Sequence, residues 1–207
     1  MIDSKRRKTA LILISMSIPM FIPLLMHILG YRLVIFNNIG LDRNNLAPWY
    51  AWIFAFVVTL LYVLYTFKKI PFVYKMQKEV SLFKLVGLVS IIGGLIEELV
   101  FRQWLIDLLD SKGYNIIIQV LISAIMFALI HIIWVIFSRD MKFLLGAFIS
   151  TFLLGTLLGI VYLIGNRNVG PCIISHALIN VIIEPWLLLA AISKDWKTKK
   201  YNIPERI

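Results

Sequence analysis

The chain contains few charged residues and only one cysteine. Asp, Glu, Lys and Arg make up 15% of its 207 residues, against roughly 25% in soluble globular proteins. The hydrophobic share is 60% and the mean hydropathy is +0.88. This composition excludes an ordinary soluble domain and indicates an integral membrane protein. Because Cys172 is the only cysteine, no disulfide can form within the chain, and cysteine usage does not reveal the redox compartment.

Six apolar segments are long enough to cross a bilayer, which takes about 20 apolar residues. They cover residues 9–30, 48–67, 82–107, 114–137, 141–164 and 169–192. The connecting segments are too short to hold a soluble domain, and the sequence has no repeat or low-complexity tract. We therefore predict an all-α fold, a polytopic transmembrane helical bundle of about six spans that forms one domain over residues 1–207.

The basic residues are distributed unevenly between the segments that connect these spans. Cytoplasmic loops of membrane proteins carry an excess of Lys and Arg. With the N-terminus inside, sixteen of the 21 Lys and Arg residues fall on the cytoplasmic side and four outside, while Arg102 lies within the third span. Both termini are thus predicted to be cytoplasmic, and the net charge of +10 is explained by anionic lipid without nucleic acid. The basic N-terminus also fits a signal peptide, but the long first run without a clear cleavage site favours an uncleaved anchor.

Glu97 and Glu98 are adjacent within the apolar third span. A carboxylate inside a membrane is costly, so such residues face the bundle interior or a wet cavity. Arg102 follows Glu98 by four residues, a spacing that places opposite charges on one helical face. We expect Glu98 to pair with Arg102, which leaves Glu97 without a partner on its own helix and available as a general base. The alternative is that both Glu residues pair with Arg or Lys from other helices.

Two further pairs of residues lie one helical turn apart in the later spans. Phe127 precedes His131 in the fourth span, and His176 precedes Asn180 in the sixth. Two neighbouring donors such as the second pair can hold a developing oxyanion. The alternatives are a hydrogen-bonded core histidine for His131 and an interhelical hydrogen-bond pair for His176 and Asn180. Glu184 lies one turn further along the sixth span, where we expect an interfacial or structural role.

The ordered set of these motifs resembles the CPBP family, the CAAX prenyl endopeptidases and bacteriocin-processing membrane proteins that are also called the Abi family. The family pattern is a double Glu followed after three residues by Arg, then Phe-x-x-x-His, a Gly-rich apolar helix, and His-x-x-x-Asn. The matching positions are Glu97, Glu98, Arg102, Phe127, His131, His176 and Asn180. The resemblance covers about residues 82–184 as a catalytic core, preceded by a two-span N-terminal part over residues 1–81 without specific motifs.

The resemblance implies an intramembrane endopeptidase that hydrolyses a peptide bond in a peptide or membrane-protein substrate. Together with the Ile-, Lys- and Asn-rich composition, it indicates a bacterial plasma membrane. By the family's pattern, Glu97 and His131 would activate a water molecule, and His176 with Asn180 would form the oxyanion site. The supporting residues would be Glu98, Arg102 and Phe127. A rival reading is non-enzymatic, a bacteriocin self-immunity or scaffolding membrane protein that keeps the polar cluster for structure or binding.

A metal site is the alternative to glutamate chemistry. The family has also been described as metalloproteases, and Glu97, His131 and His176 supply a zinc ligand set of the His₂Glu type. The sequence lacks the His-Glu-x-x-His spacing of zinc proteases, so we favour chemistry without a metal cofactor. We disfavour Cys172 as a nucleophile, because Pro171 and Cys172 fit the opening turn of the sixth helix.

Glycines and residue depth give two further expectations. The Gly155-x-x-x-Gly159 stretch predicts close helix approach in the fifth span, while Gly93 and Gly94 either loosen the third span or give a substrate backbone room. At 1.5 Å per residue, Glu97 lies about 22 Å from the inner end of its span but His131 only about 9 Å. Helix tilt, a later start of the third helix or a reversed topology would reconcile the two depths.

Overall fold

The computed structural model describes residues 2–31, 33, 36, 39–40, 45–79, 81–133 and 139–195. Within these ranges the chain forms helices, turns and loops, and no strand. The predicted all-α class is therefore confirmed. Parts of two sequence-based expectations lie outside the described residues: the end of the fourth span at 134–137, and the basic residues Arg32, Arg43, Lys197, Lys199, Lys200 and Arg206.

The helical passes follow the six predicted spans. Five helices are long and apolar enough to cross a membrane, namely α1 (Ile2–Ile28), α2 (Trp49–Lys69), α6 (Ile116–Ile130) with its 3₁₀ extension η5 (His131–Ile133), α8 (Met141–Ile164) and α9 (Gly170–Ser193). The predicted third span consists of three consecutive segments, α4 (Val86–Glu98), the π-helix η4 (Leu99–Trp104) and α5 (Leu105–Ser111). Between α2 and α4 lie the short helix α3 (Pro71–Met76) and the 3₁₀ turn η3 (Leu82–Leu85).

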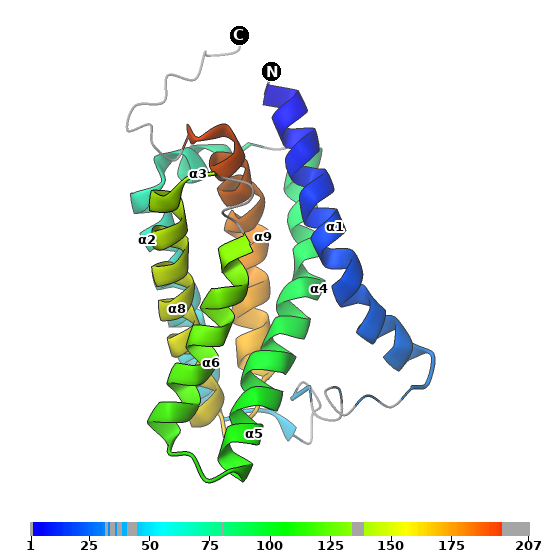
Figure 1. The fold of residues 1–207 in the computed structure, drawn as a ribbon, viewed down its shortest axis with the longest axis vertical. Coiled ribbons are helices and arrows are strands. Elements are labelled where there is room, and N and C mark those ends of the chain that lie inside the picture. Colours follow the sequence, from blue (N-terminus) through cyan, green and yellow to red (C-terminus); the bar gives the residue numbers. More distant parts are fainter. Residues whose placement is uncertain are drawn as a thin grey trace.

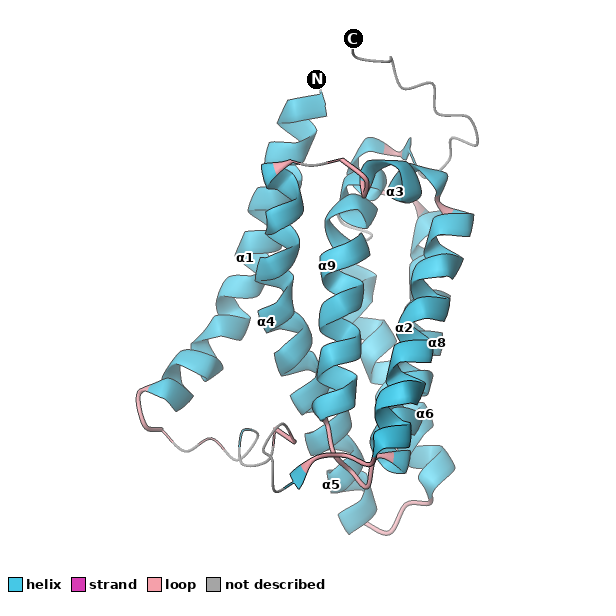
Figure 2. Cartoon of the chain, turned by 180° about the vertical axis from the view of Figure 1, so that it is seen from behind, coloured by secondary structure: helices cyan, strands magenta, loops and turns pink. Residues whose placement is uncertain are grey.

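Helix α9 occupies the centre of the bundle (Figures 1 and 2), where it contacts α1, α2, α3, α4 and α8. The start of α1 and the end of α9 lie at the same end of the bundle as α3 (Figure 1). This common position agrees with an even number of passes. The assignment of this end to the cytoplasm stays a prediction from the basic residues.

Helix α1 is attached to the bundle mainly through its N-terminal half. It packs against α4 and α9, and both views show its second half diverging from them (Figures 1 and 2). Arg6, near its start, pairs with Glu79 through two contacts of 2.8 and 2.5 Å. Pro19 and Pro23 lie inside this helix and remove backbone hydrogen bonds. The diverging half therefore leaves space between α1 and α4.

The α-helical part of the fourth span ends at Ile130, and the 3₁₀ turn η5 continues it to Ile133, the last described residue before 139. Helix α6 has 15 residues, a length of about 22 Å, whereas α8 and α9 have 24 residues each, about 36 Å. It stops well short of the end of the bundle that carries α3 (Figure 1). His131, the C-cap residue of α6, therefore lies within the depth of the bundle. Helix α4 begins later than predicted, at Val86.

The Gly-x-x-x-Gly stretch packs α8 tightly against α6. A Cβ atom on Gly155 would lie 3.1 Å from Ala124 Cα and 3.2 Å from Phe127 Cδ1. A Cβ atom on Gly159 would lie 3.3 Å from a methyl group of Val120. The predicted close helix approach is confirmed, and the partner is the helix that carries Phe127.

Candidate active site

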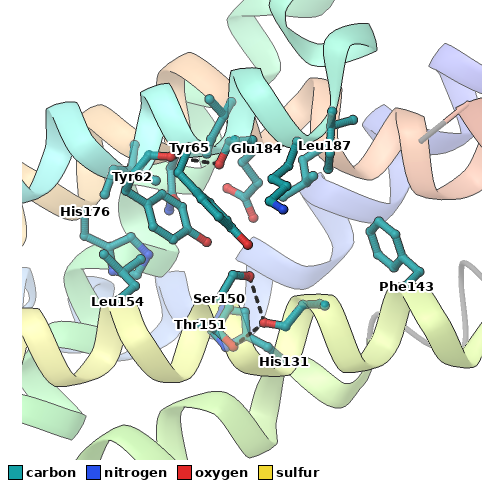
Figure 3. A pocket seen from close by; sticks show the side chains of 18 of the residues that line it. Tyr62, Tyr65, His131, Phe143, Ser150, Thr151, Leu154, His176, Glu184 and Leu187 are labelled. Atoms are coloured by element: carbon teal, nitrogen blue, oxygen red, sulfur yellow. Dashed lines mark hydrogen bonds between the residues drawn. The ribbon is translucent and has the colours of Figure 1, made fainter. Parts of the chain in front are cut away.

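Four side chains line each of two cavities among the described residues: His131, His176, Asn180 and Glu184. One cavity, of about 270 Å³, is lined by α2, α8 and α9 (Figure 3). The other, of about 430 Å³, is lined by α1, α4 and α9, and Glu97 faces it. We call these the α2 cavity and the α1 cavity. The α1 cavity is thus lined by all four residues predicted to be catalytic: Glu97, His131, His176 and Asn180.

Glu98 contacts both Arg102 and His176 through buried atoms. The Arg102 Nε atom lies 3.0 Å from Glu98 Oε2, and both side chains are fully buried. The predicted ion pair is therefore present. The other carboxylate oxygen, Glu98 Oε1, lies 2.7 Å from His176 Nδ1. This second contact was missed by the sequence analysis, because Glu98 and His176 are 78 residues apart and on different spans.

The contact with Glu98 determines which nitrogen of His176 faces the cavity. An ionised carboxylate only accepts hydrogen bonds, so Nδ1 of His176 carries the hydrogen that it shares with Glu98. The opposite nitrogen, Nε2, lies 3.8 Å from Oε2 of Glu97. Glu98 thus orients the imidazole so that Nε2 points towards the Glu97 carboxylate.

His131 presents a hydrogen-bond acceptor to the same space. Its Nδ1 atom lies 2.7 Å from the backbone carbonyl oxygen of Phe127, which can only accept, so Nδ1 donates. In the neutral ring, Nε2 then keeps a lone pair. His131 interacts electrostatically with Glu97 and His176. The lone pair of His131 Nε2 and the carboxylate of Glu97 can thus both accept a proton from a water molecule in the cavity, as general bases do.

Phe127 packs against two histidine rings and one guanidinium group. Its ring centroid lies 4.6 Å from that of His131 and 5.7 Å from that of His176. The guanidinium carbon of Arg102 lies 4.4 Å from the ring centroid, a cation–π distance. Phe127 is itself fully buried. It therefore holds both histidines and the arginine in position, which agrees with the supporting role that the resemblance implied.

The π-helix η4 begins directly after Glu98. Segments of this type are uncommon and are frequently found at functional sites. Here the backbone carbonyl of Phe101, inside η4, accepts a hydrogen bond of 2.7 Å from the Ser123 hydroxyl of α6. The altered hydrogen-bonding pattern changes the direction of the side chains that follow Glu98 without ending the helix. No pattern of residue types had indicated it.

Comparison with known protein families identifies the region that carries these residues. Residues 79–182, just over half of the chain, match the family described as type II CAAX prenyl endopeptidase Rce1-like. The chain belongs to this family. The resemblance to the CPBP proteins is thereby confirmed, and membership supports a multi-pass membrane protein with protease activity of the CAAX type. No curated protein and no solved structure matches the chain significantly.

The alternative zinc ligand set consists of Glu97, His131 and His176. Among the described residues, no group of three or more His, Cys, Asp or Glu side chains is arranged to hold a metal ion. His131 and His176 each already use Nδ1, for Phe127 and Glu98 respectively. These hydrogen bonds leave the Nε2 atom of each histidine free, as in histidines that bind a metal, so the choice between metal-free and zinc chemistry stays a prediction.

Cys172 has a structural position in this member of the Rce1-like family. It is fully buried in the first turns of α9, and its thiol donates to the carbonyl oxygen of Leu158 at 3.3 Å. Pro171 occupies the first turn of the same helix, as the sequence predicted. The thiol therefore packs α9 against α8 and does not face His176 as a nucleophile would.

Glu184, for which the sequence predicted an interfacial or structural role, lies beside the proposed catalytic residues. It lies one helical turn beyond Asn180 on α9 and lines both the α1 and the α2 cavity. The signal that pointed to it was the continued spacing of four residues after His176 and Asn180.

The two adjacent glycines of α4 have different environments. A Cβ atom on Gly94 would lie 3.1 Å from Asn180 Nδ2 and 3.3 Å from His176 Cγ, whereas one on Gly93 would meet nothing within 4 Å. Gly93 lines the α1 cavity. Gly94 thus allows α4 to pack against the histidine and asparagine of α9, while Gly93 leaves room beside them.

We expect Gly94→Ala to lower kcat by about 10-fold or more while the protein still folds, because the added methyl group displaces two proposed oxyanion donors by a few tenths of an ångström. Gly93→Ala is the matched control for helix propensity, since it adds the same group to the same helix without a clash. Steady-state kinetics of both variants in detergent would measure the effect. Equal kcat values for the two variants would contradict the packing role of Gly94.

Proposed function

We propose that the chain is an intramembrane endopeptidase in which Glu97 and His131 activate a water molecule for attack on a substrate carbonyl carbon. The observation that carries this proposal is that Glu97, His131, His176 and Asn180 all line the α1 cavity. The four side chains come from three helical segments, α4, η5 and α9. Packing within one helix therefore does not explain why they converge there. A polar cavity of this kind is what hydrolysis inside a bilayer needs.

The attacking water would lose its proton to the base formed by Glu97 and His131 as its oxygen bonds to the carbonyl carbon. His131 Nε2 is the acceptor nitrogen, because Nδ1 donates to Phe127. The carbonyl oxygen becomes an oxyanion in the tetrahedral intermediate. When that intermediate collapses, the C–N bond breaks and the same proton moves to the leaving nitrogen, which gives a carboxylic acid and an amine.

The oxyanion would be held by His176 and Asn180. One N–H of the Asn180 carboxamide donates to the carbonyl oxygen of Ser90 at 3.2 Å, and the amide nitrogen has a second N–H. His176 donates to the oxyanion from Nε2 only as an imidazolium, because its other nitrogen already donates to Glu98. The carboxylate of Glu98 is placed to stabilise that positive charge, and Arg102 holds Glu98 in place.

The substrate would be a peptide or a membrane-protein segment that passes from one cavity to the other. Because His131, His176 and Asn180 line both cavities, a scissile bond bound at these residues has one flank in the α1 cavity and the other in the α2 cavity. The proposed setting is a bacterial plasma membrane with both termini cytoplasmic, as the basic residues predict.

The proposed reaction needs no metal cofactor, and this can be measured. We expect the purified protein in liposomes to cleave members of an internally quenched peptide library at the same rate before and after exhaustive treatment with a tight chelator. Glu97→Gln, which keeps the side chain's size, should be inactive in the same assay. Activity that is lost on chelation and restored by stoichiometric zinc would contradict the metal-free mechanism. An unimpaired Glu97→Gln variant would contradict the proposed function itself.

A further inference from the structure

Glu184 has an unpartnered oxygen next to the proposed catalytic residues. Its Oε2 atom is buried and, among the described residues, makes no hydrogen bond. The Ser90 hydroxyl, which lines the α1 cavity with Glu184, interacts with this carboxyl group, but the two do not meet the geometry of a hydrogen bond. No ion pair found in the described part of the chain includes Glu184. A buried polar atom normally has a partner, so an unsatisfied carboxylate oxygen at a cavity indicates a ligand group.

Three hydroxyl groups of the α2 cavity already have hydrogen-bond partners. The hydroxyl groups of Ser150 and Thr151 donate to the backbone carbonyl of Ala147, and that of Thr66 donates to the carbonyl of Tyr62 (Figure 3). Most of the cavity surface is apolar. Glu184 is the one acidic side chain among the described residues that line it. Among the described residues that line this cavity, an unpartnered carboxyl oxygen is therefore found only at Glu184.

Two aromatic rings extend into the cavity beside this carboxylate. Tyr62 and Tyr65 reach in from α2, opposite Glu184 on α9 (Figure 3). Tyr62 interacts electrostatically with both Tyr65 and Glu184. Lys69 and Lys142 also line the cavity, and Lys69 Nζ lies 5.9 Å from the centroid of the Tyr65 ring. Neither lysine forms an ion pair with Glu184 in the described structure. A carboxylate beside aromatic faces in an apolar cavity is the environment that binds an ammonium or guanidinium group.

We propose that Glu184 is a specificity-determining residue that binds a Lys or Arg side chain of the substrate within one or two residues of the scissile bond. Glu184 lies four residues, about 6 Å, beyond Asn180 along α9. An extended substrate advances about 3.3 Å per residue, so the separation corresponds to one or two residues. The position of the cation relative to the scissile bond rests on the proposed function. Binding of the cation at Glu184 does not, because binding needs no turnover.

Binding to an inactive variant tests the cation site by itself. In the Glu97→Gln protein, acetyl-Leu-Lys-Leu-amide should bind about 10- to 100-fold more tightly than acetyl-Leu-norleucine-Leu-amide, whose side chain has the same four carbons without the ammonium group. Adding Glu184→Gln should remove this difference, and adding Glu184→Asp should keep part of it. Glu79→Gln removes the same charge at a surface ion pair and should keep the difference.

Turnover by the unsubstituted protein separates this inference from the proposed function. The internally quenched library should show a preference for Lys or Arg within two residues of the cleaved bond, and Glu184→Gln should remove it. Equal affinities of the lysine and norleucine peptides overturn the cation site, and this comparison stands even if Glu184→Gln fails to fold. Lysine-selective binding without any cleavage supports the site and overturns the protease proposal instead.

Discussion

Glu97→Ala and His131→Ala should each abolish peptide cleavage, and the double variant should be no slower than either single variant. Both side chains line the α1 cavity, and they interact electrostatically. If they act as one unit on a single water molecule, removal of either stops the step, so the two losses are not additive. Single-turnover rates in detergent, at saturating peptide, would measure all three variants against background hydrolysis.

Both substitutions should leave the fold intact. Glu97 is partly exposed to its cavity, with 18% of its side chain accessible, whereas its neighbour Glu98 is fully buried. Loss of activity in Glu97→Ala should therefore occur with an unchanged circular dichroism spectrum and elution volume. Asp110→Asn, at the far end of α5, is a control that removes a carboxylate distant from the cavity. A folded Glu97→Ala protein that cleaves at a near wild-type rate would remove this residue from the mechanism.

Glu98→Ala should cause the largest loss of stability. It leaves the Arg102 guanidinium buried without its counter-ion, because both side chains have no exposed surface. Breaking a buried ion pair from one side costs about 3–5 kcal/mol. We expect a strongly reduced yield of folded protein and a lower midpoint of unfolding in mixed micelles. Glu79→Ala breaks the partly exposed pair with Arg6, and this matched control should cost about 1 kcal/mol or less.

Adding Arg102→Ala to Glu98→Ala separates the structural role of Glu98 from its role in the site. The second substitution removes the unpaired charge, so part of the lost stability should return. Cleavage should not return, because His176 still lacks the carboxylate that orients its ring at 2.7 Å. Recovery of both stability and activity in the double variant would show that Glu98 serves only to neutralise Arg102.

Interactions within one helix were predicted from residue spacing. The Glu98–Arg102 pair and the opening of α9 at Pro171 each depend on neighbours within about one turn of the same helix. Their geometry follows from the regular rise and rotation of the α-helix. The six apolar runs likewise predicted the helical passes, because a bilayer requires segments of that length.

Contacts between helices needed the tertiary structure. Spacing does not reveal how two helices are rotated and shifted against each other, so the Glu98–His176 contact could not be derived from it. The same limit applies to the different roles of Gly93 and Gly94, which depend on where α9 lies.

The sequence by itself determined the class of the fold and the residue types of the candidate site, since composition and helical periodicity are local properties. Only the tertiary structure decided that His131, at the end of α6, lines the same cavity as Glu97 and that Glu184 lies where two cavities share their lining. The end of α6 and the position of Glu184 both depend on packing between residues far apart in the chain. Such packing is set by the shapes of all the helices together.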